Sequence, residues 1–405
     1  MLISEKLVWL LGNFFEKKVK QFRSGQQEVF NQLTNCIDTN KAKIWMHVSS
    51  LGEYEQGLPV IEKLQEKYPN YQIILSFFSP SGYEIKKNSS PADCVVYLPI
   101  DHRKNVRQFL DLVSPQMAFF VKYDFWPNYL FELQKRNIPT YLISGLFTQK
   151  HKFFKPQNAW LKKSLQAFTH FFVQDENSKK VLAQQGFDNV SVTGDTRFDR
   201  VYQIAQQAEE LDFVKQFKQD KKLFIAGSSW QQGEQIIANY INQSSNEIKF
   251  LIAPHLVDKN HVASIKKSIQ KSVILFSEIT KETIPADYKV LILDTIGMLN
   301  KTYKYADIVY IGGGFGKSIH NIQEPAVFGV PLITGPKIDK FNEALALQQL
   351  GGLSVINTQA DFNNLLDSWL NNEALRQEKA EITKQYALQN VGATEKIIKF
   401  LEQHA

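Results

Sequence analysis

The chain has 405 residues, of which 43% are hydrophobic and 22% are charged, and its formal net charge is +6. This composition excludes a disordered or fibrous protein, and the length favours two globular domains over one. No apolar run reaches the roughly 20 residues that a membrane-spanning helix needs. The two cysteines, Cys36 and Cys94, form no CxxC pair, so we expect neither a disulfide framework nor a zinc site, in keeping with a reducing compartment.

The positive charge is concentrated in the first half of the chain. Residues 1–200 carry 26 Lys and Arg against 19 Asp and Glu, which is +7, whereas the remainder carries 21 against 22. A basic half suits an anionic partner such as acidic lipid, phosphate or nucleic acid. An ordinary solvated surface has the same charge, so both interpretations stay open at this point.

The N-terminus begins with a short apolar segment, Leu7–Phe15, followed by the basic segment Lys17–Arg23. Together they are typical of an interfacial membrane anchor. The same pattern also suits an amphipathic terminal helix that docks on the protein.

Short apolar runs then alternate with helical segments, which is typical of parallel strands that are covered on both faces. The strands predicted in the first half are Lys43–Val48, Gln72–Phe78, Val95–Leu98, Met117–Val121, Thr140–Ile143 and Phe171–Val173. A polar helical stretch, Val201–Lys222, is the candidate linker. The strands predicted after it are Leu223–Ala226, Phe250–Ile252, Val273–Phe276, Val290–Leu293, Ile308–Ile311 and Pro331–Ile333, and two amphipathic helices end the chain.

These elements predict an α/β protein with two Rossmann-like, doubly wound domains. Ligands of such sheets bind outside the carboxyl ends of the strands, so the side chains that follow strands are the candidates for function.

Glu53 follows the first predicted strand, within Ser49-Ser-Leu-Gly-Glu53. A carboxylate in a partly dry site can have a raised pKa and act as a general base. A helix-start acid stabilised by the helix dipole is the alternative. His47, inside the strand, is predicted to be a packed histidine.

Another strand is followed by Lys122-Tyr-Asp-Phe-Trp126, which combines a cation, an acid and aromatic rings. Contact with a sugar or lipid and a simple helix start are both open. The segment Gln149–Lys163 interleaves lysines with aromatic residues, which suits an anionic membrane or a phosphorylated substrate. No nucleic-acid-binding module accompanies it, so we expect no nucleic acid partner.

The second half carries a glycine cluster, Gly312–Gly316, between a strand and the sequence His320-Asn-Ile-Gln-Glu324. A strand, a glycine turn and a helix start can present backbone N–H groups to a phosphate, with Glu324 near ribose hydroxyls. A turn that needs glycine only for its geometry is the alternative. Ser228, Ser229 and Arg197 are further candidates to donate to phosphate.

Taken together, ordered motifs between Lys43 and Gly352 resemble the 3-deoxy-D-manno-oct-2-ulosonic acid (Kdo) transferases of lipopolysaccharide synthesis. These motifs are Ser50-Leu-Gly-Glu53, Phe125-Trp-Pro-Asn128, Gly194-Asp-Thr-Arg-Phe-Asp199, Gly227-Ser-Ser-Trp230, Asp294-Thr-Ile-Gly-Met298, Gly312-Gly-Gly through His320-Asn-Ile-Gln-Glu-Pro325, and Gly335-Pro336 with Phe341-Asn342.

The resemblance implies a GT-B architecture, with an acceptor domain at 1–205, a CMP-Kdo domain at 206–385 and a C-terminal helix at 386–405 that packs back on the first domain. It implies an inverting transfer of Kdo from CMP-Kdo to a lipid A precursor, with Glu53 as the base and no metal cofactor. It also implies a peripheral position on the cytoplasmic face of the inner membrane.

Two groups of binding residues are expected from these motifs. The donor group is Ser228, Ser229, His255, Gly313, Gly314, Asn321, Glu324 and Arg197. The acceptor group is Ser50, Gly52, Lys122, Asp124 and Trp126. The chain departs from the family pattern in three places. Lys122 and Asp124 stand where an acidic pair is usual, and Pro254-His255-Leu256 stands where Pro-Arg-His is usual, without the arginine. The N-terminal anchor is also shorter than is usual in the family. A GT-B enzyme that uses a UDP-sugar is the alternative, and a two-domain ligand receptor without turnover is a more distant one.

Overall fold

The computed structural model describes residues 12–280, 282–316 and 318–404, with side chains from residue 19 onward. The predicted anchor Leu7–Phe15 therefore lies outside the described side chains. The chain divides into unit 1, Met1–Arg200 with Val391–Ala405, and unit 2, Val201–Asn390. The described helices include none that is long and apolar enough to span a bilayer.

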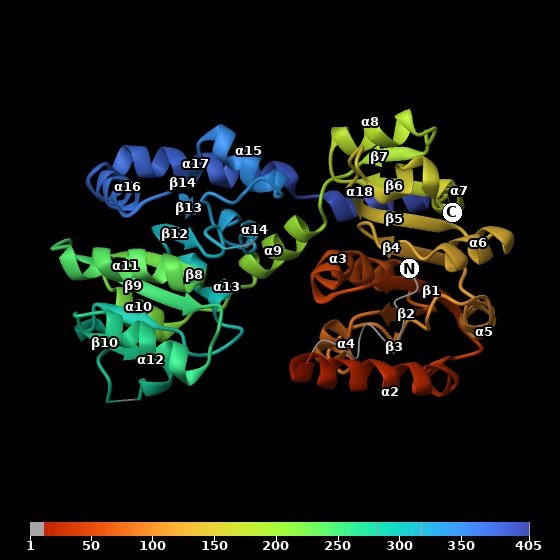
Figure 1. The fold of residues 1–405 in the computed structure, drawn as a ribbon, viewed down its shortest axis with the longest axis horizontal. Coiled ribbons are helices and arrows are strands. Elements are labelled where there is room, and N and C mark those ends of the chain that lie inside the picture. Colours follow the sequence, from red (N-terminus) through yellow and green to blue (C-terminus); the bar gives the residue numbers. More distant parts are fainter. Residues whose placement is uncertain (1–11, 281, 317, 405) are drawn as a thin grey trace. The chain divides into compact units, whose positions relative to one another are not determined.

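Unit 1 is built on a seven-stranded parallel sheet with the strand order β3-β2-β1-β4-β5-β6-β7 (Figure 1). Its strands are β1 (Ala42–Val48), β2 (Tyr71–Phe77), β3 (Cys94–Tyr97), β4 (Met117–Val121), β5 (Thr140–Gly145), β6 (His170–Val173) and β7 (Val190–Val192). Its helices are α2 (Gly12–Cys36), α3 (Leu51–Lys67), α4 (Pro80–Lys86), α5 (Arg103–Val113), α6 (Pro127–Lys135), α7 (Ala159–Ser164), α8 (Glu176–Gln184) and α18 (Ala393–His404). Helix α9 (Arg197–Gln206) continues into unit 2.

Unit 2 has a second seven-stranded parallel sheet, in the order β10-β11-β9-β8-β12-β13-β14. Its strands are β8 (Lys222–Ser229), β9 (Ile248–Pro254), β10 (Val273–Leu275), β11 (Val290–Ile292), β12 (Ile308–Ile311), β13 (Leu332–Thr334) and β14 (Leu353–Val355). Its helices are α10 (Asp212–Lys218), α11 (Gln231–Gln243), α12 (Lys259–Ser268), α13 (Leu299–Thr302), α14 (Gln323–Ala326), α15 (Asn342–Leu350), α16 (Gln359–Asn371) and α17 (Glu373–Asn390). Short 3₁₀ turns lie at Lys152–Phe154, Pro156–Asn158, Leu165–Ala167, Phe276–Glu278, Pro285–Asp287 and Tyr303–Tyr305.

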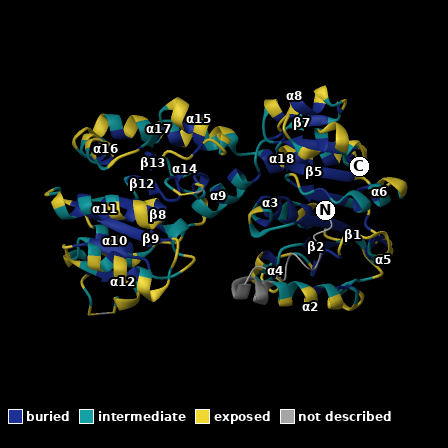
Figure 2. Cartoon of the chain, in the orientation of Figure 1, coloured by how far each residue is buried: buried dark blue, intermediate teal, exposed yellow. Residues whose placement is uncertain are grey.

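The central strands of both sheets are buried along nearly their whole length, because helices cover both faces (Figure 2). This confirms the predicted α/β class with two doubly wound sheets. The prediction missed one edge strand in each sheet, β7 and β14, each of which has only three residues.

Helix α18 returns to unit 1 and packs against α3, with Ile397, Ile398 and Leu401 in the core of that unit. Asp199 holds the start of this helix, since its carboxylate accepts from the backbone N–H groups of Gly392 and Thr394. The end of the chain is thus part of the first unit's core.

The structure corrects the prediction about the cysteines. Cys36 at the end of α2 and Cys94 at the start of β3 form a disulfide, with their Cα atoms 5.7 Å apart. The two residues are 58 positions apart in the sequence. Only the packing of α2 against β3 brings them together, so no local motif marks the pair.

Candidate active site

The candidate site of unit 1 lies at the point where the strand order reverses. From β1 the chain proceeds to β2 and β3 on one side and then to β4 on the other side. The loops that follow β1 and β4 diverge there, which opens a crevice at the carboxyl ends of the two strands. Ser49–Glu53 and Lys122–Trp126 occupy these two loops, so the fold brings the predicted segments together.

Glu53 lies in the first turn of α3, partly buried, with Ser50 as the N-cap. Its Oε2 accepts from the backbone N–H of Ser49 at 2.5 Å, and its own N–H donates to the hydroxyl of Ser50. Burial, together with the negative charge of Asp124, raises the pKa of Glu53 to about 7. A carboxyl group with this pKa is well suited to accept a proton at neutral pH.

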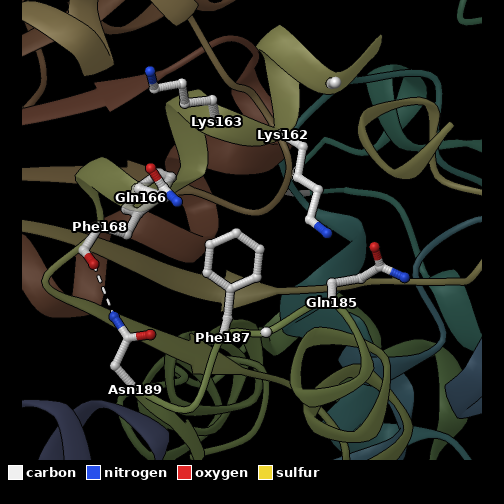
Figure 3. A pocket seen from close by; sticks show the side chains of 9 residues that line it. Lys162, Lys163, Gln166, Phe168, Gln185, Phe187 and Asn189 are labelled. Atoms are coloured by element: carbon white, nitrogen blue, oxygen red, sulfur yellow. Dashed lines mark hydrogen bonds between the residues drawn. The ribbon is translucent and has the colours of Figure 1, made fainter. Parts of the chain in front are cut away.

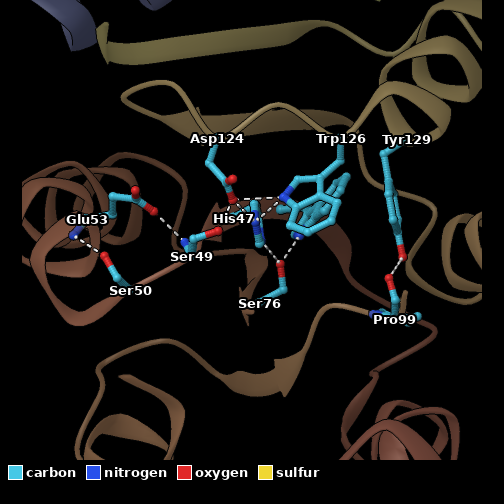
Figure 4. A network of polar contacts seen from close by, with 10 residues as sticks. His47, Ser49, Ser50, Glu53, Ser76, Pro99, Asp124, Trp126 and Tyr129 are labelled. Carbon is cyan, nitrogen blue, oxygen red and sulfur yellow. Dashed lines mark hydrogen bonds and ion pairs between the residues drawn. The ribbon is translucent and has the colours of Figure 1, made fainter. Parts of the chain in front are cut away.

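Asp124 is the centre of a polar network beside Glu53 (Figure 4). One of its oxygens, Oδ2, accepts from the indole N–H of Trp126 at 2.8 Å and also from the hydroxyl of Ser49. Nε2 of His47 lies 2.9 Å from the same oxygen. Two donors, the hydroxyl of Ser49 and the indole N–H of Trp126, therefore converge on one carboxylate oxygen next to Glu53.

The network continues into the sheet through His47. The indole of Trp45 donates to the hydroxyl oxygen of Ser76, and Nδ1 of His47 lies 2.9 Å from the same oxygen. The indole N–H of Trp126 is shared between Oδ2 of Asp124 and Nε2 of His47, which is 2.9 Å away. His47 is buried, as expected, but its role in positioning Asp124 was missed. One signal of this role was present in the sequence. His47 lies two residues before Ser49, so both side chains point to the same side of β1.

The remaining predicted acceptor residues lie in the same loops. Gly52 is exposed in the first turn of α3, and Lys122 has a left-handed backbone, with φ of 66°. Arg197 was predicted with the donor residues. Its guanidinium instead donates to the carbonyl of Gly52, 3.3 Å away, within unit 1. The structure therefore groups Arg197 with the residues around Glu53.

The motif Gly194–Asp199 that contains Arg197 has a mainly structural role. The carboxylate of Asp195 accepts from the amide of Gln56 on α3, and the hydroxyl of Thr196 donates to the carbonyl of the same glutamine. Together with Asp199 at the start of α18, these contacts tie α3, α9 and α18 to one another.

The candidate site of unit 2 also lies where its strand order reverses, between β8 and β12. There the glycines pack against backbone. A Cβ on Gly312 would lie 1.9 Å from the carbonyl oxygen of Ser228, and Gly313 has a φ of 92°. The close approach of two adjoining loops thus requires these glycines. This requirement is the one that the alternative interpretation of the motif expects.

The helix expected after these glycines is only one turn long, since α14 spans Gln323–Ala326. A single turn has a small dipole, so this helix contributes little to the predicted phosphate site, which stays a prediction. Asn321 caps the turn by accepting from the N–H of Gln323, and its amide donates to Glu324 at 3.0 Å. Asn321 and Glu324 thus form a pair at the carboxyl edge of the sheet.

The two serines at the end of β8 differ in their exposure. Ser229 is buried, and its hydroxyl donates to Glu234 at 2.8 Å. Ser228 is partly exposed, with a left-handed backbone at φ 48°. His255 follows β9 and stacks on Trp230, with their ring centroids 4.4 Å apart. Trp230 and His320 were not among the predicted binding residues, although both lie at this edge.

Two hollows lie on unit 1 away from Glu53. One, of about 440 Å³, has no predicted site residue in its lining and lies at the amino ends of β6 and β7 (Figure 3). It is lined by Ala159, Lys162, Lys163, Gln166, Phe168, Gln185, Gly186, Phe187 and Asn189. The other, of about 690 Å³, runs along α5 and is strongly basic, with Arg103, Lys104 and Arg107 in its lining. Among the described residues no group of three His, Cys, Asp or Glu side chains is arranged to hold a metal ion.

Comparisons with known proteins agree with this geometry. Residues 19–200 match the family model described as 3-deoxy-D-manno-octulosonic-acid transferase (kdotransferase). The chain is 25% identical to the 3-deoxy-D-manno-octulosonic acid transferase of Haemophilus influenzae, over 100% of this chain and 97% of that protein. It is 26% identical to the 3-deoxy-D-manno-octulosonic acid transferase of Chlamydophila psittaci, over 73% of this chain and 69% of that protein.

A solved structure shares the fold. UDP-GlcNAc 2-epimerase from Neisseria meningitidis, bound to UDP-GlcNAc, superposes with a TM-score of 0.63 over 89% of this chain and 100% of that chain, at 15% identity. Two parallel doubly wound units define the GT-B fold. More specifically, residues 19–200 match the Kdo transferase family model, and the chain is similar to Kdo transferases along most of its length.

Proposed function

We propose that the protein transfers Kdo from CMP-Kdo to a lipid A precursor, with inversion at the anomeric carbon and with Glu53 as the general base. The observation that carries the proposal is the carboxyl group of Glu53, which lies at the switch point of unit 1 and has a pKa of about 7. A base with a pKa near the working pH is half-deprotonated and still accepts a proton well.

The chemistry follows from a single displacement. The acceptor hydroxyl attacks the anomeric carbon of Kdo while Glu53 takes its proton. The bond between that carbon and the phosphate oxygen breaks, and its electron pair leaves with CMP. Because CMP is already a good leaving group and the carbon develops oxocarbenium character, we propose that no metal is needed, and transfer should continue at an unchanged rate in EDTA.

The acceptor side of the proposal rests on charge. Unit 1 contains the basic hollow along α5, and α5 begins at the same edge of the sheet as the loop that holds Glu53. The lipid A precursor carries phosphates and lies in an anionic membrane, and both attract such a surface.

We propose on the same ground a peripheral attachment to the cytoplasmic face of the inner membrane. Sedimentation with anionic vesicles tests it, since each engaged basic residue contributes about 1 kcal/mol at low salt. Deleting residues 1–20 should weaken vesicle binding and leave CMP binding unchanged. Full-length protein that ignores anionic vesicles at low salt would contradict this attachment.

The choice of nucleotide separates the proposal from its alternative. The epimerase that shares this fold binds UDP-GlcNAc, which favours a UDP-sugar as the second candidate donor. Calorimetric titration with CMP, CTP and UDP decides between them. The proposal expects CMP and CTP to bind more tightly than UDP, and the reverse order would favour the UDP-sugar enzyme.

A further inference from the structure

Three aromatic rings from three different loops meet at the carboxyl edge of unit 2. Trp230 follows β8, His255 follows β9 and His320 follows β12, and these strands are neighbours in the sheet. The rings of Trp230 and His255 are stacked with centroids 4.4 Å apart, and His320 lies 4.4 Å from His255. The planes of Trp230 and His320 are nearly parallel, at 12°.

One hydrogen bond within this group determines the protonation of His320. The indole Nε1 of Trp230 lies 2.8 Å from Nε2 of His320. An indole N–H can only donate, so Nε2 has to accept and cannot carry a proton. His320 is then a neutral imidazole with its proton on Nδ1. Burial, with the neighbouring His255, lowers the pKa of His320 to about 4, which agrees with a neutral ring.

The outer edges of these rings remain available for a ligand. Trp230 is 39% exposed, and within the described part of the chain no hydrogen bond involves Nδ1 of His320 or either ring nitrogen of His255. A flat surface with uncommitted N–H groups therefore lies beside Asn321 and Glu324, at the switch point of the sheet.

We propose that Trp230 fixes His320 as the imidazole protonated on Nδ1, and that this N–H donates to a phosphate oxygen of the bound nucleotide. The ligand part of this inference rests on the proposed function. The neutral N–H forms a charge-assisted hydrogen bond with the anionic phosphate. Because the ring carries no charge, it adds no ion pair and should retain the product CMP less strongly than an imidazolium would.

The test uses the full-length protein labelled with ¹⁵N-histidine and long-range proton–nitrogen spectra, with and without CMP. The chain has eight histidines, and H320Q identifies the signals of His320. We expect an unprotonated Nε2 and a protonated Nδ1 in the free protein, and a shift of the Nδ1 signal when CMP binds.

Two pairs of variants separate a ligand contact from a structural one. W230F keeps the stacked ring but removes the N–H, so His320 should change to a mixture of tautomers. CMP affinity should then fall by at most about 10- to 150-fold, the range for one hydrogen bond to a charged group. W160F changes an exposed tryptophan of unit 1 and should alter neither readout. H320N places an amide N–H near the position of Nδ1 and should keep most of the affinity, whereas H320Q places it near Nε2 and should not.

A protonated Nε2 in the wild-type protein would overturn the tautomer assignment. An unmoved Nδ1 signal with CMP bound, together with equal affinity of H320N and H320Q, would overturn the ligand contact while the proposed function stands. If the wild-type protein binds no CMP at all, the ligand contact fails with the proposed function, and the spectrum of the free protein still decides the tautomer.

Discussion

The two switch points of this molecule use different chemistry on the same topology. In unit 1, ionisable side chains dominate: Glu53 lies beside Asp124, whose Oδ2 accepts from Ser49 and Trp126. In unit 2, closely packed glycine backbone and the rings of Trp230, His255 and His320 lie near two carboxylates, which are Glu324 and the buried Glu234. The first arrangement suits proton transfer, which needs a tuned pKa, and the second suits a ligand that brings its own negative charge.

The two sites also differ in how their polar groups are held in place. The network around Asp124 links β1, β2 and β4 through His47, Ser76 and Trp126, so the charge next to Glu53 is held by the core of the sheet. At the other site, Ser229 is already engaged by Glu234, and Asn321 by Glu324. The ring edges of Trp230, His255 and His320 and the partly exposed Ser228 lie at the same edge as the pair of Asn321 and Glu324.

The largest expected effect comes from removing the base. E53Q keeps the size of the side chain but cannot accept the proton, so the transfer rate should fall by about 10²–10⁴ while CMP affinity stays unchanged. Steady-state kinetics and calorimetry measure the two quantities. E55Q is the matched control, since Glu55 pairs with Lys86 and Arg200 outside the network. Near wild-type turnover in E53Q would remove Glu53 from the mechanism.

A change in unit 2 should act on binding instead. E324A removes the carboxylate that pairs with Asn321, so CMP affinity should fall by about 10- to 150-fold, the range for hydrogen bonds to a charged group. Calorimetry with CMP checks this. E378A, on an exposed position of α17, should bind CMP like the wild-type protein. If both variants bind CMP equally well, Glu324 is not part of the donor site.

Glu53 should also make stability depend on pH. Its pKa is raised in the folded state from 4.5 to about 7, so the folded state favours the protonated form. The stability this contributes is present below about pH 4.5 and is lost as the pH rises through 7. E53Q should therefore be more stable than the wild-type protein at pH 8, by about 1–3 kcal/mol after allowance for partial exposure, and equally stable at pH 4.5. Urea unfolding at both pH values is the measurement, and the same difference at both would contradict the raised pKa.

The smallest effect is a shift in the pH dependence of transfer. D124N keeps the shape of the side chain but removes the negative charge that helps raise the pKa of Glu53. The acidic limb of the rate profile should therefore move to lower pH than in the wild-type protein. A limb that stays in place would show that burial alone sets this pKa.

Much of the fold could be predicted because the central strands are long apolar runs. Those of β1 and β4 were located almost to the residue, as were the loops that carry Glu53 and Asp124. The edge strands β7 and β14 were missed because each has three residues with a serine in the middle, which interrupts the apolar run.

Contacts between distant segments could not be predicted. His47 gave no sign of its bond to Asp124, which lies 77 positions away in the sequence. Arg197 meets Gly52 across 145 positions, and Cys36 meets Cys94 only through the packing of α2 on β3. The single turn of α14 was taken for a longer helix because Asn321 and Glu324 have the spacing of a helix start.

The central claim is transfer of Kdo from a CMP-activated donor to a lipid A precursor. The direct measurement incubates the purified full-length protein with CMP-Kdo generated in situ and tetra-acylated lipid A precursor, and then weighs the lipid product by mass spectrometry. The account predicts a lipid heavier by whole Kdo residues with the wild-type protein and unmodified lipid with E53Q over the same time. Unmodified lipid with the wild-type protein, or the same product from E53Q at the same rate, would contradict it.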